Sequence, residues 1–130
     1  MDGVVAVVCE DLLGFGCAAA IATIDVLSEP GFLDGVRARG EQLRAGLRAL
    51  AEEDAGLVEV RGPGLMVASE LADAGRVAAV LRHCLDDGHL ILMNAGTFGT
   101  VIRWMPPLVV SEDEIDRALA AFAKALAATR

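Results

Sequence analysis

The run from residue 94 to residue 108 constrains the fold of this sequence more than any other stretch. A loop with two glycines leads into Val101–Trp104, which reads as a short strand whose only charge is Arg103. Pro106 and Pro107 end this strand, because proline has no amide hydrogen to donate to a sheet ladder. The run therefore predicts a loop followed by a strand in which Arg103 lies among apolar neighbours.

The arginine and the loop before it form the candidate binding site. Gly96 and Gly99 bracket the loop, with Thr97 between them, and glycine allows positive φ or a close approach of the backbone to a ligand. The Arg103 guanidinium offers a rigid fork of donors that suits a carboxylate or a phosphate. In the alternative reading, Arg103 pairs with a surface acid and the glycines are ordinary turn residues.

In the rest of the chain, apolar residues recur either at the period of a helix or at the period of a strand. Residues 4–8 could form a buried strand, and Ser111 with Glu114 matches a helix capping box. The inward positions of the helix at 74–87 are predicted to be Val77, Val80, Leu81, Cys84 and Leu85, with Gly88 as its C-terminal stop. The patterns predict helices at 17–27, 35–53, 74–87 and after 111, and strands at 57–61, 65–71, 89–93 and around Arg103. This order predicts an α+β, two-layer fold: a small mixed or antiparallel sheet covered by helices on one face.

Composition excludes several function classes. The 130 residues fit one domain, and a net charge of −8 argues against nucleic-acid binding. No apolar run reaches the length of about 18 residues that a membrane span requires. Three cysteines without a metal or disulfide spacing favour a reduced, cytoplasmic setting. His83 and His89 have no partners at ligand spacing, so no metal site is predicted.

Four segments in order resemble the class III pyridoxal-phosphate-dependent aminotransferases. They are Ala18–Leu27, Val36–Leu43, Val60–Met66 and the signature Gly96–Leu108. The 4-aminobutyrate branch is the most similar, although Phe98 and Thr100 stand where its pattern has tyrosine and asparagine. The resemblance implies that residues 17–130 form the small C-terminal domain of a fold type I enzyme. It also implies that Arg103 binds the carboxylate of an amino-acid or keto-acid substrate.

The residues that this family uses to hold its cofactor are missing from the resemblance. Lys124 is the only lysine, and it is expected on the solvent face of the last helix, not in a Schiff base. Residues 1–16 diverge from the family, and Asp11 stands where a phosphate-contacting segment would be and would repel phosphate. No pyridoxal phosphate is therefore expected on the isolated chain, although the family as a whole uses it.

Two functions stay open on the sequence. In the first, the chain is a truncated aminotransferase, inactive alone, whose family moves an amino group from 4-aminobutyrate or a related ω-amino acid to 2-oxoglutarate. Its partner would be a large domain or a further copy of the chain. In the second, the same fold is a non-catalytic module that binds a small carboxylate or a protein.

Overall fold

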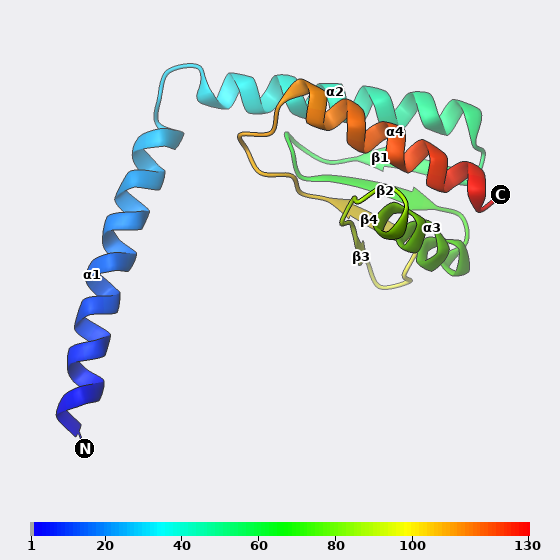
Figure 1. Cartoon of the computed structure of the whole chain (residues 1–130). Helices are drawn as coiled ribbons and strands as arrows, with labels where there is room; N and C mark the ends of the chain where they lie inside the picture. Colours follow the sequence, from blue (N-terminus) through cyan, green and yellow to red (C-terminus); the bar gives the residue numbers. More distant parts are fainter. Residues whose placement is uncertain (1) are drawn as a thin grey trace. The chain divides into compact units, whose positions relative to one another are not determined.

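A computed structural model describes the backbone from residue 2 to residue 130 and the side chains from residue 14 onward (Figure 1). The chain divides into two units, 1–34 and 35–130, and each is described by itself. The elements in chain order are α1 (Asp2–Leu27), α2 (Phe32–Glu53), β1 (Leu57–Arg61), β2 (Val67–Leu71), α3 (Ala74–Asp86), β3 (Met93–Ala95), β4 (Val101–Trp104) and α4 (Glu112–Ala128).

The first unit contains helix α1, the turn that follows it and residues 32–34 at the start of α2. The predicted strand at 4–8 is wrong, because these residues belong to α1. A helix satisfies its backbone hydrogen bonds within its own segment, whereas a strand needs a partner, and the β preference of valine is too weak to supply one. The helix ends where the sequence predicted, before a turn with Gly31 at φ 86°.

Apolar side chains dominate the described part of α1. Phe15, Ile21 and Ile24 are exposed. Among the described residues, no single helix is long and apolar enough to cross a membrane; 14–27 and 32–53 meet that test of length and composition only as a bent pair.

The second unit is built on a four-stranded sheet of order β1-β2-β4-β3, in which every neighbouring pair is antiparallel. The α+β prediction is confirmed. The sequence predicted either a mixed or an antiparallel sheet, and the sheet is antiparallel. Side chains alternate between the faces along each strand. On β2, Ser69 is fully buried while its neighbours Ala68 and Glu70 are only half-buried, so one face of the sheet is the core face.

Helices α2, α3 and α4 share one core with that face, as predicted. Trp104 on β4 stacks edge-on against Phe122 of α4, with ring centroids 5.0 Å apart. The capping box at the start of α4 is confirmed, since Glu114 and Ser111 exchange the two hydrogen bonds that define it. The buried apolar residues are Leu43, Leu47, Leu57, Leu65, Val67, Leu71, Val77, Val80, Cys84, Ile102, Trp104, Ile115, Phe122, Ala125 and Leu126.

The third strand lies later in the chain than the pattern predicted. The expected strand at 89–93 is replaced by β3, Met93–Ala95. His89 has φ 50°, a left-handed conformation that a strand residue does not adopt. The chain therefore turns at His89 and enters the sheet four residues later.

Helix α3 differs from its prediction in two details. Leu85, expected to face inward, is 52% exposed. Gly88 does not end the helix through positive φ, which His89 adopts instead. A Cβ on Gly88 would lie 2.8 Å from the carbonyl oxygen of Cys84 and 2.9 Å from the Cβ of Ala121, so glycine is needed there for the close approach of α4.

Candidate functional site

The face of the sheet opposite the core carries the arginine that the sequence singled out. Arg103 lies one residue before the end of β4, and its side chain is exposed on this face. It pairs in register with Ala68 of β2 on one side and with Met93 of β3 on the other. Both of these cross-strand neighbours are apolar. We call this surface, with Glu70 of β2, the open face.

Arg103 makes no ion pair with any acid in the described part of the chain. Its one recorded contact is a hydrogen bond of 3.3 Å from Nη2 to the sulfur of Met93. A thioether is a weak acceptor, so this contact does not neutralise the guanidinium. The predicted alternative, in which Arg103 pairs with a surface acid, is therefore not what the described contacts show.

The nearest acids on the open face are bound to other groups. Arg61 binds Glu59 at 2.5 Å and Glu70 at 2.7 Å, and these two carboxylates lie opposite each other in the β1–β2 register. Thr100 donates its hydroxyl to the second oxygen of Glu70 at 3.0 Å. The hydrogen bonds from Arg61 and then from Thr100 lower the pKa of Glu70, so this carboxylate stays charged and in place.

The glycine loop has the conformation that its sequence predicted. Gly96 has φ 78° and Gly99 has φ 71°. The Asn94 side chain donates to the carbonyl oxygen of Gly99 at 3.0 Å and braces the loop. Thr97 and Phe98 form its tip, and Phe98 is 84% exposed.

The loop and Arg103 belong to one β3–β4 hairpin. Ala95 pairs with Val101 at the loop end, and Met93 pairs with Arg103 two residues farther along. The described contacts include none between Arg103 and the loop residues Gly96, Thr97 and Gly99, so these remain candidates by position only. Sequence reasoning missed Met93 and Glu70. A cross-strand partner becomes visible only once the register is known.

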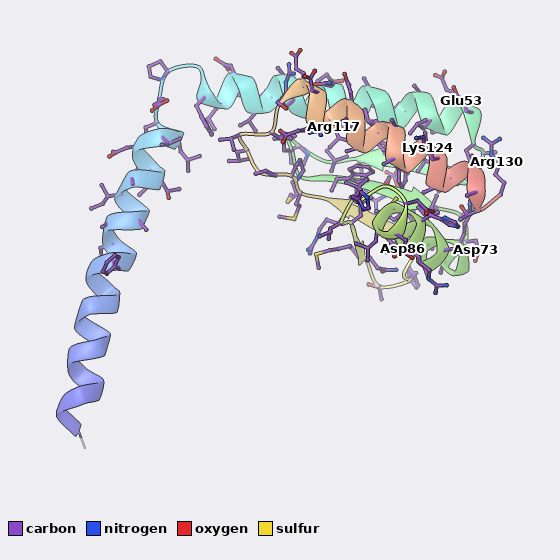
Figure 2. All side chains as sticks on the ribbon, in the orientation of Figure 1. Glu53, Asp73, Asp86, Arg117, Lys124 and Arg130 are labelled. Atoms are coloured by element: carbon purple, nitrogen blue, oxygen red, sulfur yellow. The ribbon has the colours of Figure 1, made fainter. Side chains whose placement is uncertain are left out.

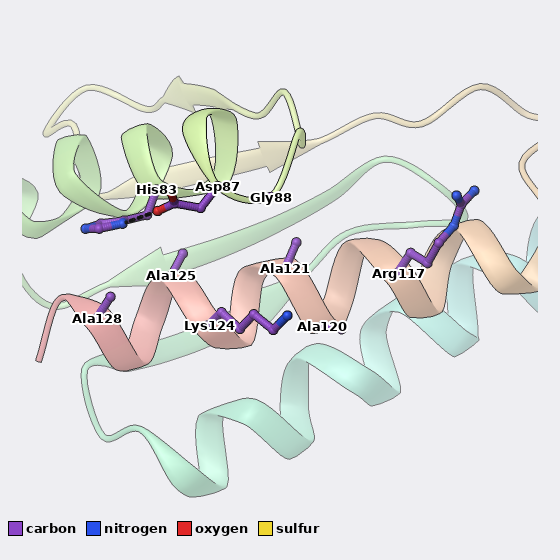
Figure 3. A pocket seen from close by; sticks show the side chains of 9 residues that line it. All are labelled: His83, Asp87, Gly88, Arg117, Ala120, Ala121, Lys124, Ala125 and Ala128. Carbon is purple, nitrogen blue, oxygen red and sulfur yellow. Dashed lines mark hydrogen bonds and ion pairs between the residues drawn. The ribbon is translucent and has the colours of Figure 1, made fainter.

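Several pockets lie elsewhere in this unit. One of them, about 440 Å³, lies between α3 and α4, and Figure 3 shows the side chains that line it. His83 binds Asp87 there at 2.8 Å, while Lys124 and Arg117 extend from α4 in different directions. Another, about 340 Å³, is mostly apolar and is lined by Trp104 and the double proline, among other residues. A third is an open surface hollow at the start of α4. Arg103 lines none of the three.

The described residues do not fit pyridoxal phosphate. This cofactor needs a lysine for its Schiff base, an acid at the pyridine nitrogen and a phosphate cradle. Lys124, the only lysine of the sequence, is exposed on α4, as predicted (Figure 2). In the cavity that it lines, Asp87 is bound by His83, and Arg117 lies 4.0 Å from Glu114. Glu70, the acid near Arg103, is bound by Arg61 and Thr100.

Metal and thiol chemistry have equally little support. No group of three or more His, Cys, Asp or Glu side chains within the described range is placed to hold a metal ion. Cys84 is fully buried, and burial raises its pKa to about 11, which leaves it a neutral packing residue.

Comparisons with known proteins agree with the fold and with the family that the signature Gly96–Leu108 resembles. The family profile of the class III aminotransferases matches residues 15–126. An acetylornithine aminotransferase of Nostoc sp. is 45% identical over 116 residues, which cover 87% of this chain and 26% of that protein. An L-lysine-epsilon aminotransferase of Amycolatopsis lactamdurans is 41% identical, with 83% of this chain and 24% of that protein covered.

Solved structures show the same fold. The lysine aminotransferase of M. tuberculosis, in its internal aldimine form, matches with a TM-score of 0.77 and 31% identity, over 83% of this chain and 24% of that chain. The N-acetylornithine aminotransferase of Stenotrophomonas maltophilia matches with a TM-score of 0.77 and 30% identity, over 85% of this chain and 30% of that chain. The chain spans about a quarter of the length of the curated relatives it matches. On the match of residues 15–126, it belongs to the class III aminotransferases.

Proposed function

We propose that this chain acts as the small-domain part of an aminotransferase that moves an amino group from an ω-amino acid to 2-oxoglutarate. The donor class includes 4-aminobutyrate and its longer relatives. Similar proteins are named for acetylornithine, lysine at its ε position and 5-aminovalerate, all of which carry an amino group far from a carboxylate. In this proposal residues 17–130 are the small domain, and residues 1–16 are a separate, divergent segment.

One observation carries the proposal: Arg103 is a guanidinium without a carboxylate partner in the described structure, exposed on the open face. Most of the other arginines of the described chain bind acids; Arg44, for example, binds Glu41 and Arg76 binds Asp54. Arg82 is the other one with no recorded partner, but it lies on the outer surface of α3. Arg103 combines an available charge with the signature of the family.

The role of Arg103 in this proposal is to bind and orient the substrate carboxylate. The planar fork can donate two parallel hydrogen bonds, which fixes direction as well as charge. Ala68 leaves room on one side because its side chain is a single methyl group. Within a site closed to water, deletion of one partner of such a pair costs on the order of 2–4 kcal/mol.

The cofactor chemistry must come from outside the described residues. Pyridoxal phosphate supplies the electron sink for transamination in enzymes that use it. Since Lys124 and its surroundings do not fit that group, the proposal requires that the remaining family residues come from outside residues 1–130. We propose a large-domain polypeptide for this role, with self-association of the chain as the alternative.

The test is to supply the missing part. Residues 17–130 are fused to, or mixed with, the segment of the Nostoc relative that this chain does not cover. Turnover of 4-aminobutyrate, 5-aminovalerate and acetylornithine is then measured with wild type, Arg103→Lys and Arg103→Gln. We expect Arg103→Gln to lower kcat/KM by about 30- to 1000-fold, the equivalent of the energy above, and Arg103→Lys to recover part of it.

Arg82→Gln is the matched control, since it removes an equally unpaired arginine from another surface. If an active assembly keeps its kcat/KM after Arg103→Gln, the assignment of Arg103 is wrong. If Arg82→Gln loses as much, the effect is one of net charge, and the assignment again fails.

A second candidate function is a carboxylate-binding module without catalysis. The exposed Arg103 without a carboxylate partner also favours this function, because its guanidinium can bind a ligand without any other polypeptide. Saturable binding of a small carboxylate by the isolated chain, together with failure of every large-domain partner to restore turnover, would favour this candidate over the first.

A further inference from the structure

The contact between Arg103 and Met93 is the unusual feature of the open face. The two residues lie directly opposite each other across β3 and β4, and the Arg103 Nη2 atom donates to the Met93 sulfur at 3.3 Å. Side chains at opposite positions have Cβ atoms about 4.5–5.5 Å apart. The register of β3 against β4 therefore brings the two side chains into contact. Met93 is 55% exposed, which leaves the contact accessible to a ligand.

The two sides of Arg103 are unequal. On the β2 side, Ala68 offers only a methyl group, and beyond it Arg61 is bound to Glu59 and Glu70. On the β3 side, the sulfur is the one acceptor recorded for the guanidinium. The guanidinium therefore extends toward the neighbour that offers a side-chain acceptor, Met93.

A thioether is suited to hold an arginine that must bind a carboxylate. It accepts a hydrogen bond only weakly, so it limits the rotamers of the arginine without cancelling its charge. An acid at the same position would form a charge-assisted pair and compete with the ligand. An aliphatic residue would leave the guanidinium without a preferred direction.

We infer that Met93 is a positioning residue for Arg103, holding its guanidinium in a carboxylate-ready orientation until a monocarboxylate ligand displaces the sulfur. The inference rests on the proposed function of Arg103. It extends that function by assigning a second residue, one that acts through the first. The sulfur and methyl group of Met93 also provide an apolar wall beside the bound carboxylate, which suits a ligand with a methylene chain.

The inference is tested on the whole chain as it exists, with butyrate as the probe. The Nε–Hε signal of Arg103 is followed by NMR in a labelled sample during a butyrate titration. The dissociation constant and the order of the side chain are both measured. Order is the readout that a merely structural role of Met93 would not change.

The variants separate the sulfur from the bulk of the side chain. Met93→Leu keeps an apolar wall and removes the acceptor; we expect affinity to fall by about two- to tenfold, as for release of one long side chain, and Arg103 to become more mobile. Met93→Glu places an acid opposite Arg103 and should reduce affinity by more than about tenfold. Met66→Leu is the matched control, since Met66 is 57% exposed and has no recorded contact with an arginine; it should leave binding unchanged.

The outcomes distinguish the two proposals. Backbone amide shifts report butyrate binding in the variant that lacks the Arg103 side chain. If Arg103→Gln abolishes saturable binding by that measure while Met93→Leu leaves affinity and the order of the Arg103 side chain unchanged, the inference about Met93 is overturned and the assignment of Arg103 stands. If butyrate causes no saturable shift at Arg103 in the wild type, the inference about Met93 is overturned, while the assignment of Arg103 is decided separately by the turnover of the assembled enzyme with Arg103→Gln.

Discussion

The indole nitrogen of Trp104 donates a buried hydrogen bond of 2.9 Å to the hydroxyl of Ser69. Ser69 is fully buried and Trp104 is 3% exposed, so neither group can exchange this bond for water. The bond joins β4 to β2 on the core face. It thereby favours the register that places Arg103 opposite Ala68 on the other face.

Ser69→Ala should lower the free energy of unfolding by about 1–3 kcal/mol, because it leaves the indole N–H buried without an acceptor. Trp104→Phe should cost more, since it also removes packing against Phe122. Urea unfolding of the two single variants and the double variant measures the coupling. A coupling energy near zero would show that the hydrogen bond does not stabilise the sheet.

Such pairs mark the limit of what this sequence could predict. The strand of Arg103, the helix stripes and the capping box are local patterns, and the structure confirms them. The partners of Arg103 are not local. Met93 and Ala68 become its neighbours through a register that the hydrophobic pattern alone does not set.

The errors in the prediction have local physical causes. The strand expected at 89–93 failed because His89 takes positive φ, a conformation more common for glycine. The strand expected at 4–8 failed because valine runs form helices when no strand partner is at hand. The prediction that Leu85 faces inward is wrong, because Leu85 lies at the edge of the apolar stripe of α3 and its side chain points toward solvent.

The ion pair between Arg76 and Asp54 predicts a pH dependence of stability. Asp54 is 7% exposed, and Arg76 donates to both of its oxygens, at 2.9 and 2.5 Å. These hydrogen bonds, opposed by burial and aided by the Gly56 amide, lower the pKa of Asp54 well below its ordinary value of 3.8. A lowered folded pKa means that this stability is present above about pH 4 and is lost as the pH falls further.

Asp54→Asn should therefore destabilise the chain by about 3–5 kcal/mol near neutral pH, because it leaves the Arg76 charge half-buried without its partner. It should also remove part of the slope of stability against pH below about pH 4. Asp86→Asn is the control, since Asp86 is exposed at the end of α3 (Figure 2). Equal acid sensitivity of Asp54→Asn and wild type would contradict this account.

Gly40 allows α2 to lie against the β1–β2 connection. A Cβ at this position would lie 2.2 Å from the carbonyl oxygen of Gly64, which Arg44 also binds at 2.9 Å. Because the obstacle is backbone, Gly40→Ala should cost at least about 1–3 kcal/mol. Gly35→Ala, in the same helix with open space around it, should instead stabilise by about 0.5–1 kcal/mol. Thermal unfolding compares the two, and a similar response of both would refute the packing argument.

Exposed apolar side chains predict self-association of the isolated chain. Phe15, Ile91 and Phe98 are each more than three-quarters exposed, at 82%, 79% and 84%. Such surface favours association because contact removes it from water. Light scattering should show a rise in mass with concentration that a large-domain partner suppresses. A constant monomer mass at every concentration would count against the prediction.

Lys124 provides the last prediction, on the cofactor. It is the only lysine of the sequence and is exposed on α4, where it lines a cavity together with His83, Asp87, Arg117 and several alanines. An internal aldimine needs a lysine in a site that also binds the cofactor phosphate and ring nitrogen. On this surface the acid Asp87 is bound by His83, and the cation Arg117 lies 4.0 Å from Glu114. Pyridoxal phosphate added to the isolated chain should therefore give no saturable aldimine absorbance band. Lys124→Arg, which keeps the charge, should give the same spectrum as wild type. A stoichiometric adduct that borohydride traps on Lys124, and that Lys124→Arg abolishes, would show instead that this chain holds the cofactor by itself.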